Sequence, residues 1–149
     1  MTMAEPLPFW HHHIGISVPD INASITWYWK ILGFEVVRRY SMPSIPAEVA
    51  MLGNGPLHIE LFKLEDAAPL PADRRIPNLD LRTHGTKHFS FAVDDAKRFA
   101  EQLARRGADI VWVKSFAQGT NVFIRDNSGN LIEFVEKPRA AARLARLPS

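Results

Sequence analysis

Hydrophobic and polar residues follow the same order in the two halves of the chain. In the first half, residues 11–18 alternate in polarity from Ile14 onwards, as expected for a strand that is covered on one side. Residues 21–32 place apolar side chains at helical spacing, and Gly33 follows, which predicts an amphipathic helix with a glycine end. Three more strands are predicted, over 34–40, 48–52 and 57–63.

The second half repeats this order. Residues 88–93 alternate in polarity, and Asp94 or Asp95 can cap a helix that ends at Gly107. Strands are predicted over 109–116, 121–125 and 130–136, the last two joined by an Asp-Asn-Ser-Gly turn. Matched residues lie 73 to 75 positions apart, from His13 to His88, from Gly33 to Gly107 and from Glu60 to Glu133. The chain therefore contains an internal repeat.

Each half has the order β-α-β-β-β, which predicts an α+β fold. We divide the chain into a module 11–63, a linker 64–86, a module 87–136 and a basic tail 137–149, within a single domain 1–149. Four strands with one helix leave one face of each sheet uncovered, so two such sheets together predict a cup. The pattern leaves open whether the cup forms within one chain or between two. The linker contains three prolines and no clear periodicity, and we expect it to be irregular.

Composition excludes several classes of protein. The formal charge of +2, from 18 basic and 16 acidic residues, gives no reason to expect nucleic acid as a partner. The absence of cysteine excludes disulfides and thiolate metal ligands. No apolar run approaches the roughly 20 residues of a membrane span, and the first ten residues lack the pattern of a secretory signal. We therefore expect a cytoplasmic protein without a membrane partner.

The candidate chemistry lies at matched positions of the repeat, in His13, Glu60, His88 and Glu133. Each His stands at the head of a strand, above small residues that leave room on the uncovered face. Each Glu lies in the last strand of its module, where a carboxylate is costly to bury unless it is paired or binds a metal. Strand stability does not require His and Glu at these positions. Together they predict a divalent metal site with nitrogen and oxygen ligands, suited to Zn, Fe, Mn, Co or Ni.

Several segments carry a resemblance to a known family: HHIGISVPDI with SITWYWKILGF, LHIELF, KHFSFAVDD and, most specifically, DNSGNLIEF at 126–134. Together they resemble the glyoxalase/bleomycin resistance protein/extradiol dioxygenase group, the vicinal oxygen chelate superfamily. The likeness covers about residues 11–136. It implies two tandem βαβββ modules that form a cup-shaped mixed sheet around a metal. It also implies that His13, Glu60, His88 and Glu133 match the family's ligand positions, with His12 as a fallback for His13.

The resemblance also implies a reaction class. A metal-chelated carbonyl makes the neighbouring C–H acidic, and a carboxylate then moves the proton. The expected enzyme is a lyase, isomerase or epimerase in which Glu60 or Glu133 is the catalytic base, as similarity to glyoxalase I suggests. Similarity to methylmalonyl-CoA epimerase offers Glu48 as a base outside the ligand set.

Two alternatives remain open at this point. An Fe(II) extradiol-type dioxygenase would use His13, His88 and Glu133 as ligands, although Glu60 would crowd that arrangement. A metal-free small-molecule binding protein, like the antibiotic-sequestering members of the family, would not need the complete ligand set. The substrate is a small molecule of unknown identity, with His58, Glu48, Trp112 and Phe116 as weak candidates for binding it. The resemblance also implies a homodimer.

Overall fold

The computed structural model describes residues 4–139, and they form two four-stranded sheets. The first sheet has the order β1-β4-β3-β2 and the second has the order β5-β8-β7-β6. In both sheets the first strand runs parallel to the last, and the other neighbours are antiparallel. The strands are β1 (Ile14–Ser17), β2 (Glu35–Ser41), β3 (Ala47–Asn54), β4 (Leu57–Leu64), β5 (Phe89–Val93), β6 (Asp109–Phe116), β7 (Gly119–Arg125) and β8 (Leu131–Glu136). The predicted α+β class with mixed sheets is confirmed.

One helix follows the first strand of each half. The helices are α1 (Ile21–Trp27), continued by the π-helix η1 (Tyr28–Leu32), and α3 (Ala96–Arg106). Side-chain oxygens of Asp20 and Asp95 accept hydrogen bonds from the backbone N–H groups of Ala23 and Arg98, both at 2.9 Å, and so cap the two helices. The predicted helix over 21–32 has the right extent, but its last five residues form a π-helix that turns Tyr28 and Ile31 into the core.

The linker is more regular than its composition suggests. It contains a 3-10 turn η2 (Ala72–Arg75) and a short helix α2 (Pro77–Asp80). Pro77 suits the first turn of α2 because its fixed φ is already helical and its missing N–H has no partner there. Asp80 is 1 % exposed and pairs with Arg74 and with Lys87, whose Nζ lies 3.3 Å from the carboxylate. These charge pairs hold the linker against the start of β5, so the prediction of an irregular segment was wrong for residues 72–75 and 77–80.

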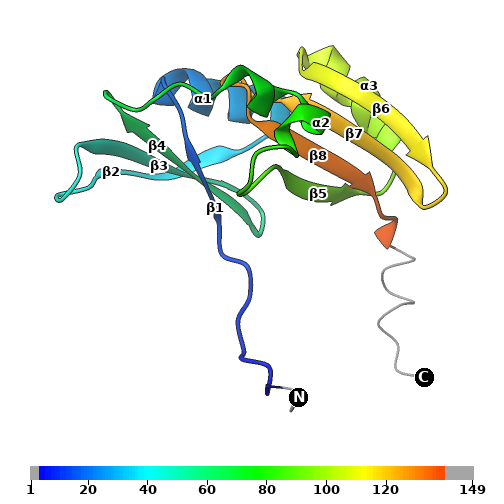
Figure 1. The fold of residues 1–149 in the computed structure, drawn as a ribbon, viewed down its shortest axis with the longest axis horizontal. Helices are drawn as coiled ribbons and strands as arrows, with labels where there is room; N and C mark the ends of the chain where they lie inside the picture. The colour runs from blue at the N-terminus through cyan, green and yellow to red at the C-terminus, as the bar shows by residue number, and fades with distance from the viewer. Residues whose placement is uncertain (1–3, 140–149) are drawn as a thin grey trace.

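The structure differs from the prediction at the N-terminal end of the first strand, and it describes only the start of the basic tail. Strand β1 begins at Ile14 rather than at residue 11, because its pairing with β4 starts at Ile14 and Ile59. Residues 4–13 form an arm that leaves the molecule on its lower side (Figure 1). Most of the basic tail lies outside the described residues. Within them, Arg139 donates hydrogen bonds to Asp94 from its backbone N–H at 2.8 Å and from Nη2 at 2.9 Å.

The two sheets lie side by side, with α1 and α3 along the upper side of the molecule (Figure 1). The core is shared between the halves, since buried residues from both belong to one apolar cluster. Phe34 and Phe91 meet across the halves, with ring centroids 6.4 Å apart. Two hydrogen bonds also cross: Tyr28 donates to Asp126 at 2.8 Å, and Arg106 donates to the Ile31 carbonyl at 2.9 Å.

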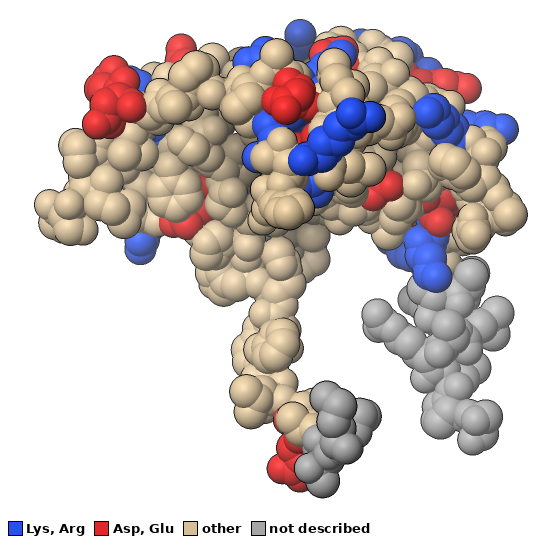
Figure 2. Space-filling model, viewed as in Figure 1, with Lys and Arg blue, Asp and Glu red and all other residues tan. Residues whose placement is uncertain are grey.

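Surface charge agrees with the small net charge of the sequence. Figure 2 shows Lys and Arg side chains interspersed with Asp and Glu on the face in view, without an extended patch of one sign. None of the helices within residues 4–139 is both long enough and apolar enough to span a bilayer.

The contact between Tyr28 and Asp126 yields a stability prediction. Burial, followed by the nearby Asp126 carboxylate, raises the pKa of Tyr28 well above its ordinary 10.0. We expect Tyr28→Phe to lower the free energy of unfolding at pH 7 by about 1–2 kcal/mol, because one buried hydrogen bond is lost. The raised pKa adds stability below pH 10 that is lost as the pH rises further, since the unfolded tyrosine ionises first.

The advantage of the wild type over Tyr28→Phe should therefore shrink above pH 10. Urea unfolding of both proteins at pH 7 and above pH 10 measures the difference in their free energies of unfolding. Because all other titrating groups are common to both proteins, their contributions cancel in this difference. A difference that is independent of pH would contradict the buried, neutral phenol.

Candidate metal centre

The first pair of candidate ligands lies on the uncovered face of the first sheet. Glu60 on β4 lies between Gly15 on β1 and Met51 on β3 in the sheet register. The glycine has no side chain, so the carboxylate has room beside it. His13, just before β1, places Nε2 at 3.0 Å from Glu60 Oε2. The other carboxylate oxygen, Oε1, accepts a hydrogen bond from the Tyr40 hydroxyl.

The second pair has the same construction in the second sheet. Glu133 on β8 lies between Ser90 on β5 and Phe123 on β7. His88, just before β5, places Nε2 at 3.3 Å from Glu133 Oε2. The other oxygen, Oε1, accepts a hydrogen bond from the Asn121 side-chain amide at 2.8 Å.

The two pairs also match in exposure. The side chains of Glu60 and Glu133 are 13 % and 14 % exposed, and those of His13 and His88 are 35 % and 31 % exposed. In each pair one carboxylate oxygen is fixed by a neutral donor and the other faces an imidazole nitrogen. Each half therefore presents one nitrogen and one oxygen donor, in an orientation set by a neighbouring hydrogen bond, which is how proteins usually orient metal ligands.

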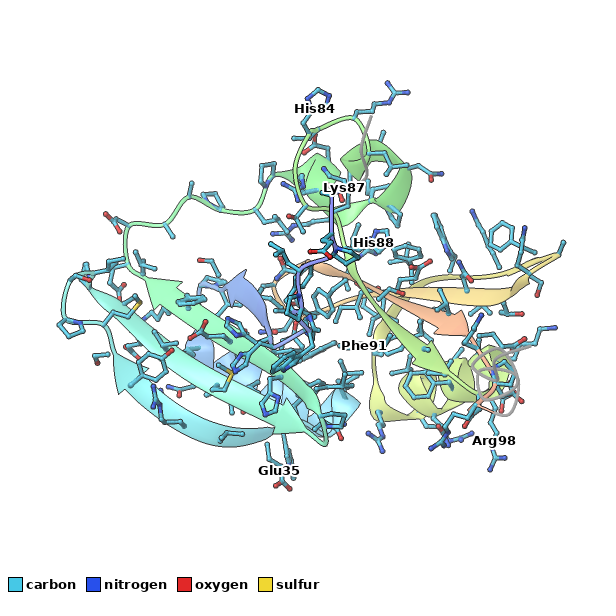
Figure 3. The ribbon with its side chains drawn as sticks, turned by 90° about the horizontal axis from the view of Figure 1, so that it is seen from below. Glu35, His84, Lys87, His88, Phe91 and Arg98 are labelled. Atoms are coloured by element: carbon cyan, nitrogen blue, oxygen red, sulfur yellow. The ribbon has the colours of Figure 1, made fainter. Side chains whose placement is uncertain are left out.

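A single chain does not gather both pairs into one site. Among residues 4–139, no three His, Asp or Glu side chains lie close enough to hold one metal ion. The structure brings His13 to Glu60 and His88 to Glu133, but it does not bring the two pairs together. Seen from below, His88 lies in the middle of the molecule, between the two sheets (Figure 3).

Three other candidates lie around the first pair. His12 contacts the far side of the His13 ring, with the two Nδ1 atoms 2.7 Å apart, so His13 rather than His12 faces Glu60. His58 is on the same strand face as Glu60, and its ring lies 6.4 Å from that of His12. Glu48 pairs with Arg39 at 3.6 Å and is 54 % exposed. Its strand parity is opposite to that of Met51, the neighbour of Glu60, so Glu48 lies on the other face of the sheet.

The aromatic candidates are in the second sheet. Trp112 is partly buried, and Phe116 is 55 % exposed at the end of the same strand. Asn121 was not a candidate from the sequence, because its position in the first module corresponds to Val49 and the repeat therefore gives no signal there. Tyr40 also belongs to the candidate metal centre, because its hydroxyl donates a hydrogen bond to the candidate ligand Glu60.

Comparison with known proteins identifies the family. The family model of the glyoxalase/bleomycin resistance protein/dioxygenase superfamily matches residues 10–134. The chain belongs to this superfamily, as the sequence motifs indicated.

Relatives by sequence include lactoylglutathione lyases. The one from Escherichia coli O157:H7 is 27 % identical over 136 residues, covering 89 % of this chain and 96 % of the relative. The uncharacterized protein YaeR of Escherichia coli strain K12 is 30 % identical over 131 residues, covering 85 % and 95 %.

Solved structures with the same fold include a glyoxalase family protein from Enterococcus faecalis, with a TM-score of 0.72 and 22 % identity over 85 % of this chain and 97 % of that one. The trypanothione-dependent glyoxalase I of Leishmania major has a TM-score of 0.68 and 21 % identity over 93 % of both chains. These likenesses extend over nearly the whole described chain and establish the glyoxalase fold.

The Tyr40 contact can be tested in the metal-free protein. The hydrogen bond to Glu60 is the main cause that raises the pKa of Tyr40. The chain has two tyrosines, so in a Tyr28→Phe background the ultraviolet absorbance of tyrosinate reports Tyr40 alone. We expect a pKa above 10.0 in that background, and a lower pKa after Glu60→Ala removes the acceptor.

Glu48→Ala is the matched control for this titration, because Glu48 lies on the opposite face and should leave Tyr40 unchanged. Equal titration curves for the Glu60 and Glu48 variants would show that the phenol does not bind the Glu60 carboxylate in solution.

Proposed function

We propose that the protein is a divalent-metal-dependent lyase of the glyoxalase I type, which moves a proton next to a chelated carbonyl. The observation that carries this proposal is the pair of equivalent His–Glu contacts, one on the uncovered face of each sheet. The similarity to lactoylglutathione lyases over almost the full length supports this reaction class. Isomerases and epimerases begin with the same proton abstraction, and the substrate decides among them.

The residues present fit a divalent metal. His13 and His88 would supply imidazole nitrogens, and Glu60 and Glu133 would supply carboxylate oxygens, which is a donor set suited to Zn, Fe, Mn, Co or Ni. Tyr40 and Asn121 each donate a hydrogen bond to Oε1 of one Glu, and Oε2 of that Glu is directed at its His.

We further propose that a second copy of the chain completes the centre. One chain holds two separate half-sites, and the centre needs one half-site of each kind. The strands that flank the pairs, β1 and β5, are edge strands whose outer sides have no partner strand in the described part of the chain. The arm 4–13 adds apolar surface for such a contact, since Leu7, Phe9 and Trp10 are 79 %, 85 % and 85 % exposed.

In this dimer, His13 and Glu60 of one copy would meet His88 and Glu133 of the other. By two-fold symmetry the same contact forms twice, which gives two equivalent centres. This arrangement uses every candidate ligand once and leaves neither His–Glu pair idle.

The carboxylates carry the proton. The metal, when bound, polarises the substrate carbonyl and lowers the pKa of the adjacent C–H. Glu60 or Glu133 takes the proton from that carbon and returns it to the neighbouring carbon, so that the carboxylate is regenerated after each turnover. Tyr40 and Asn121 each hold Oε1 of one carboxylate, which leaves Oε2 as the oxygen that would accept the proton.

The equivalence of the two pairs favours this scheme over an extradiol dioxygenase. A dioxygenase site needs two His and one carboxylate, which leaves coordination positions free for a catechol and oxygen. Here Glu60 has the same His contact, the same exposure and the same kind of fixing hydrogen bond as Glu133. A dioxygenase site with only three ligands would leave either Glu60 or Glu133 without a role, although the two carboxylates are equivalent.

Metal loading and proton transfer test the reaction class. Protein purified without chelator should contain about one divalent ion per chain, and removing it should lower the thermal stability. Lactoylglutathione formation and deuterium exchange next to a carbonyl should depend on the ion. We expect Glu60→Gln and Glu133→Gln to lower kcat by about 10²- to 10⁴-fold, because each removes a ligand and a proton acceptor.

Glu48→Gln is the control and should retain activity. Absence of metal, together with unchanged stability when metal is added, would instead point to a metal-free binding protein. Oxygen consumption with catechols, without deuterium exchange, would establish the dioxygenase.

Mixing two inactive variants tests the shared centre. We would combine a His13→Ala/Glu60→Gln protein with a His88→Ala/Glu133→Gln protein under conditions that exchange subunits. In a mixed dimer with shared centres, one centre contains all the defects and the other is intact. Random exchange should therefore restore about a quarter of the wild-type activity.

Each variant alone should stay inactive and dimeric in light scattering. Efficient subunit exchange without any recovery would show that each centre forms within one chain.

A further inference from the structure

A row of aromatic rings runs outwards from His88 across the uncovered face of the second sheet. The His88 ring meets Phe123 edge-on, with centroids 4.9 Å apart. Phe123 in turn meets Trp112 on the neighbouring strand, with centroids 5.2 Å apart. Directly opposite residues of a sheet share a face, and the register pairs Trp112 with Phe123 and Phe123 with Glu133. The row therefore begins at the candidate metal ligands and ends on β6.

Strand β6 continues this surface with a cation and another ring. Lys114 and Phe116 share the strand face of Trp112, because side chains alternate along a strand. The Lys114 ammonium group lies 3.7 Å from the centroid of the Trp112 ring. Within the part of the chain that the structure describes, Lys114 makes no salt bridge, so its charge is available to a ligand. Phe116 is 55 % exposed.

The first sheet differs at the corresponding positions. Arg38 and Tyr40 on β2 correspond in register to Trp112 and Lys114 on β6. Arg38 lies 4.4 Å from the Tyr40 ring centroid, so both sheets carry a cation–π pair, but with cation and ring exchanged. The Tyr40 hydroxyl is engaged with Glu60. At these two matched positions, the second sheet offers an aromatic ring that has no hydrogen bond to a candidate ligand.

We propose that Trp112, Lys114 and Phe116 bind the part of the substrate that lies beyond its chelating oxygens, and that this part is a flat apolar or aromatic group ending in a carboxylate. The proposal rests on the metal centre proposed above, which places the reacting carbon beside His88 and Glu133. A planar group extending from that point along the row stacks on Trp112, since flat rings pack well against an aromatic face. Its terminal carboxylate then pairs with Lys114.

The Lys114 ammonium group lies over the centroid of the Trp112 ring, so a planar group that stacks on that face displaces it. The long side chain of Lys114 lets the ammonium group move from the ring to the terminal carboxylate. Binding to Trp112 and Lys114 together therefore selects a ligand with both an apolar body and an anionic end. Trp112 is a specificity-determining residue in this proposal and takes no part in the proton transfer.

Three hydroxamates that chelate zinc through adjacent oxygens test the proposal. Acetohydroxamate has no ring, benzohydroxamate adds a ring, and 4-carboxybenzohydroxamate adds a ring and an anionic end. Calorimetric titration of the zinc-loaded full-length protein measures their dissociation constants. We expect the ring to tighten binding about tenfold and the carboxylate to add about threefold.

Substitutions then assign the two gains. Trp112→Ala should abolish the gain from the ring, and Lys114→Gln should abolish only the gain from the carboxylate. Val113→Ala is the matched control, because Val113 lies on the opposite face of the same strand and is 44 % exposed. It should leave all three constants unchanged. If thermal melting shows that Trp112→Ala does not fold, the Lys114→Gln variant still tests the proposal, because Lys114 is exposed and its loss should abolish the affinity gained from the carboxylate.

The outcomes separate this proposal from the metal centre. If acetohydroxamate binds but the ring adds no affinity, or the added affinity survives Trp112→Ala, the substrate-binding role of the row is wrong and the metal centre stands. If the protein takes up no zinc, or zinc-loaded protein does not bind acetohydroxamate, the metal centre is wrong and the substrate proposal falls with it.

Discussion

The hydrogen bond from Tyr28 to Asp126 joins the two halves of the molecule at a buried position, and together with the shared apolar core it fixes the arrangement of the sheets. Asp126 also accepts hydrogen bonds from the backbone N–H groups of Ser128 and Asn130, both at 2.9 Å, so the turn before β8 is closed around this one carboxylate. A buried carboxylate is tolerated only with such a set of donors. Because Tyr28 belongs to the first half, the turn and the strand that follows it are held against that half.

This constraint bears directly on the candidate metal centre. Glu133 is in β8, only a few residues after the turn, so the hydrogen bond from Tyr28 of η1 to Asp126 helps to hold the start of its strand. The shared apolar core fills the space between the helix-covered sides of the two halves. The uncovered faces carry the two His–Glu pairs, which stay apart within the described part of one chain. In the dimer that we propose, a second chain supplies the missing half of the centre.

The repeat has kept one part of the site and changed another. The His, the Glu and a neutral donor to the distal carboxylate oxygen recur in both sheets, although the donor is a phenol in one and an amide in the other. The strand farthest from the His has diverged, with Arg38 and Tyr40 in one half and Trp112 and Lys114 in the other. Equivalent ligands suit a symmetric cation, whereas a substrate has unlike ends. We therefore expect the difference between the halves to reflect the substrate, because a shared fold alone does not specify one.

Much of the fold follows from local signals in the sequence. Alternating polarity, two aspartate caps and the glycines after the helices were enough to predict nearly all strands and both long helices, and the repeat singled out His13, Glu60, His88 and Glu133. Strand parity placed each Glu on the uncovered face. Tertiary structure alone decided that His13 rather than His12 faces Glu60, that Tyr40 and Asn121 orient the two carboxylates, and that the linker forms helical turns around Asp80. It also decided that one chain keeps the two pairs apart. The physical reason is that the sequence pattern tells which face a side chain occupies, whereas its neighbours on that face come from strands and turns distant in the chain, and their positions depend on packing across the shared core.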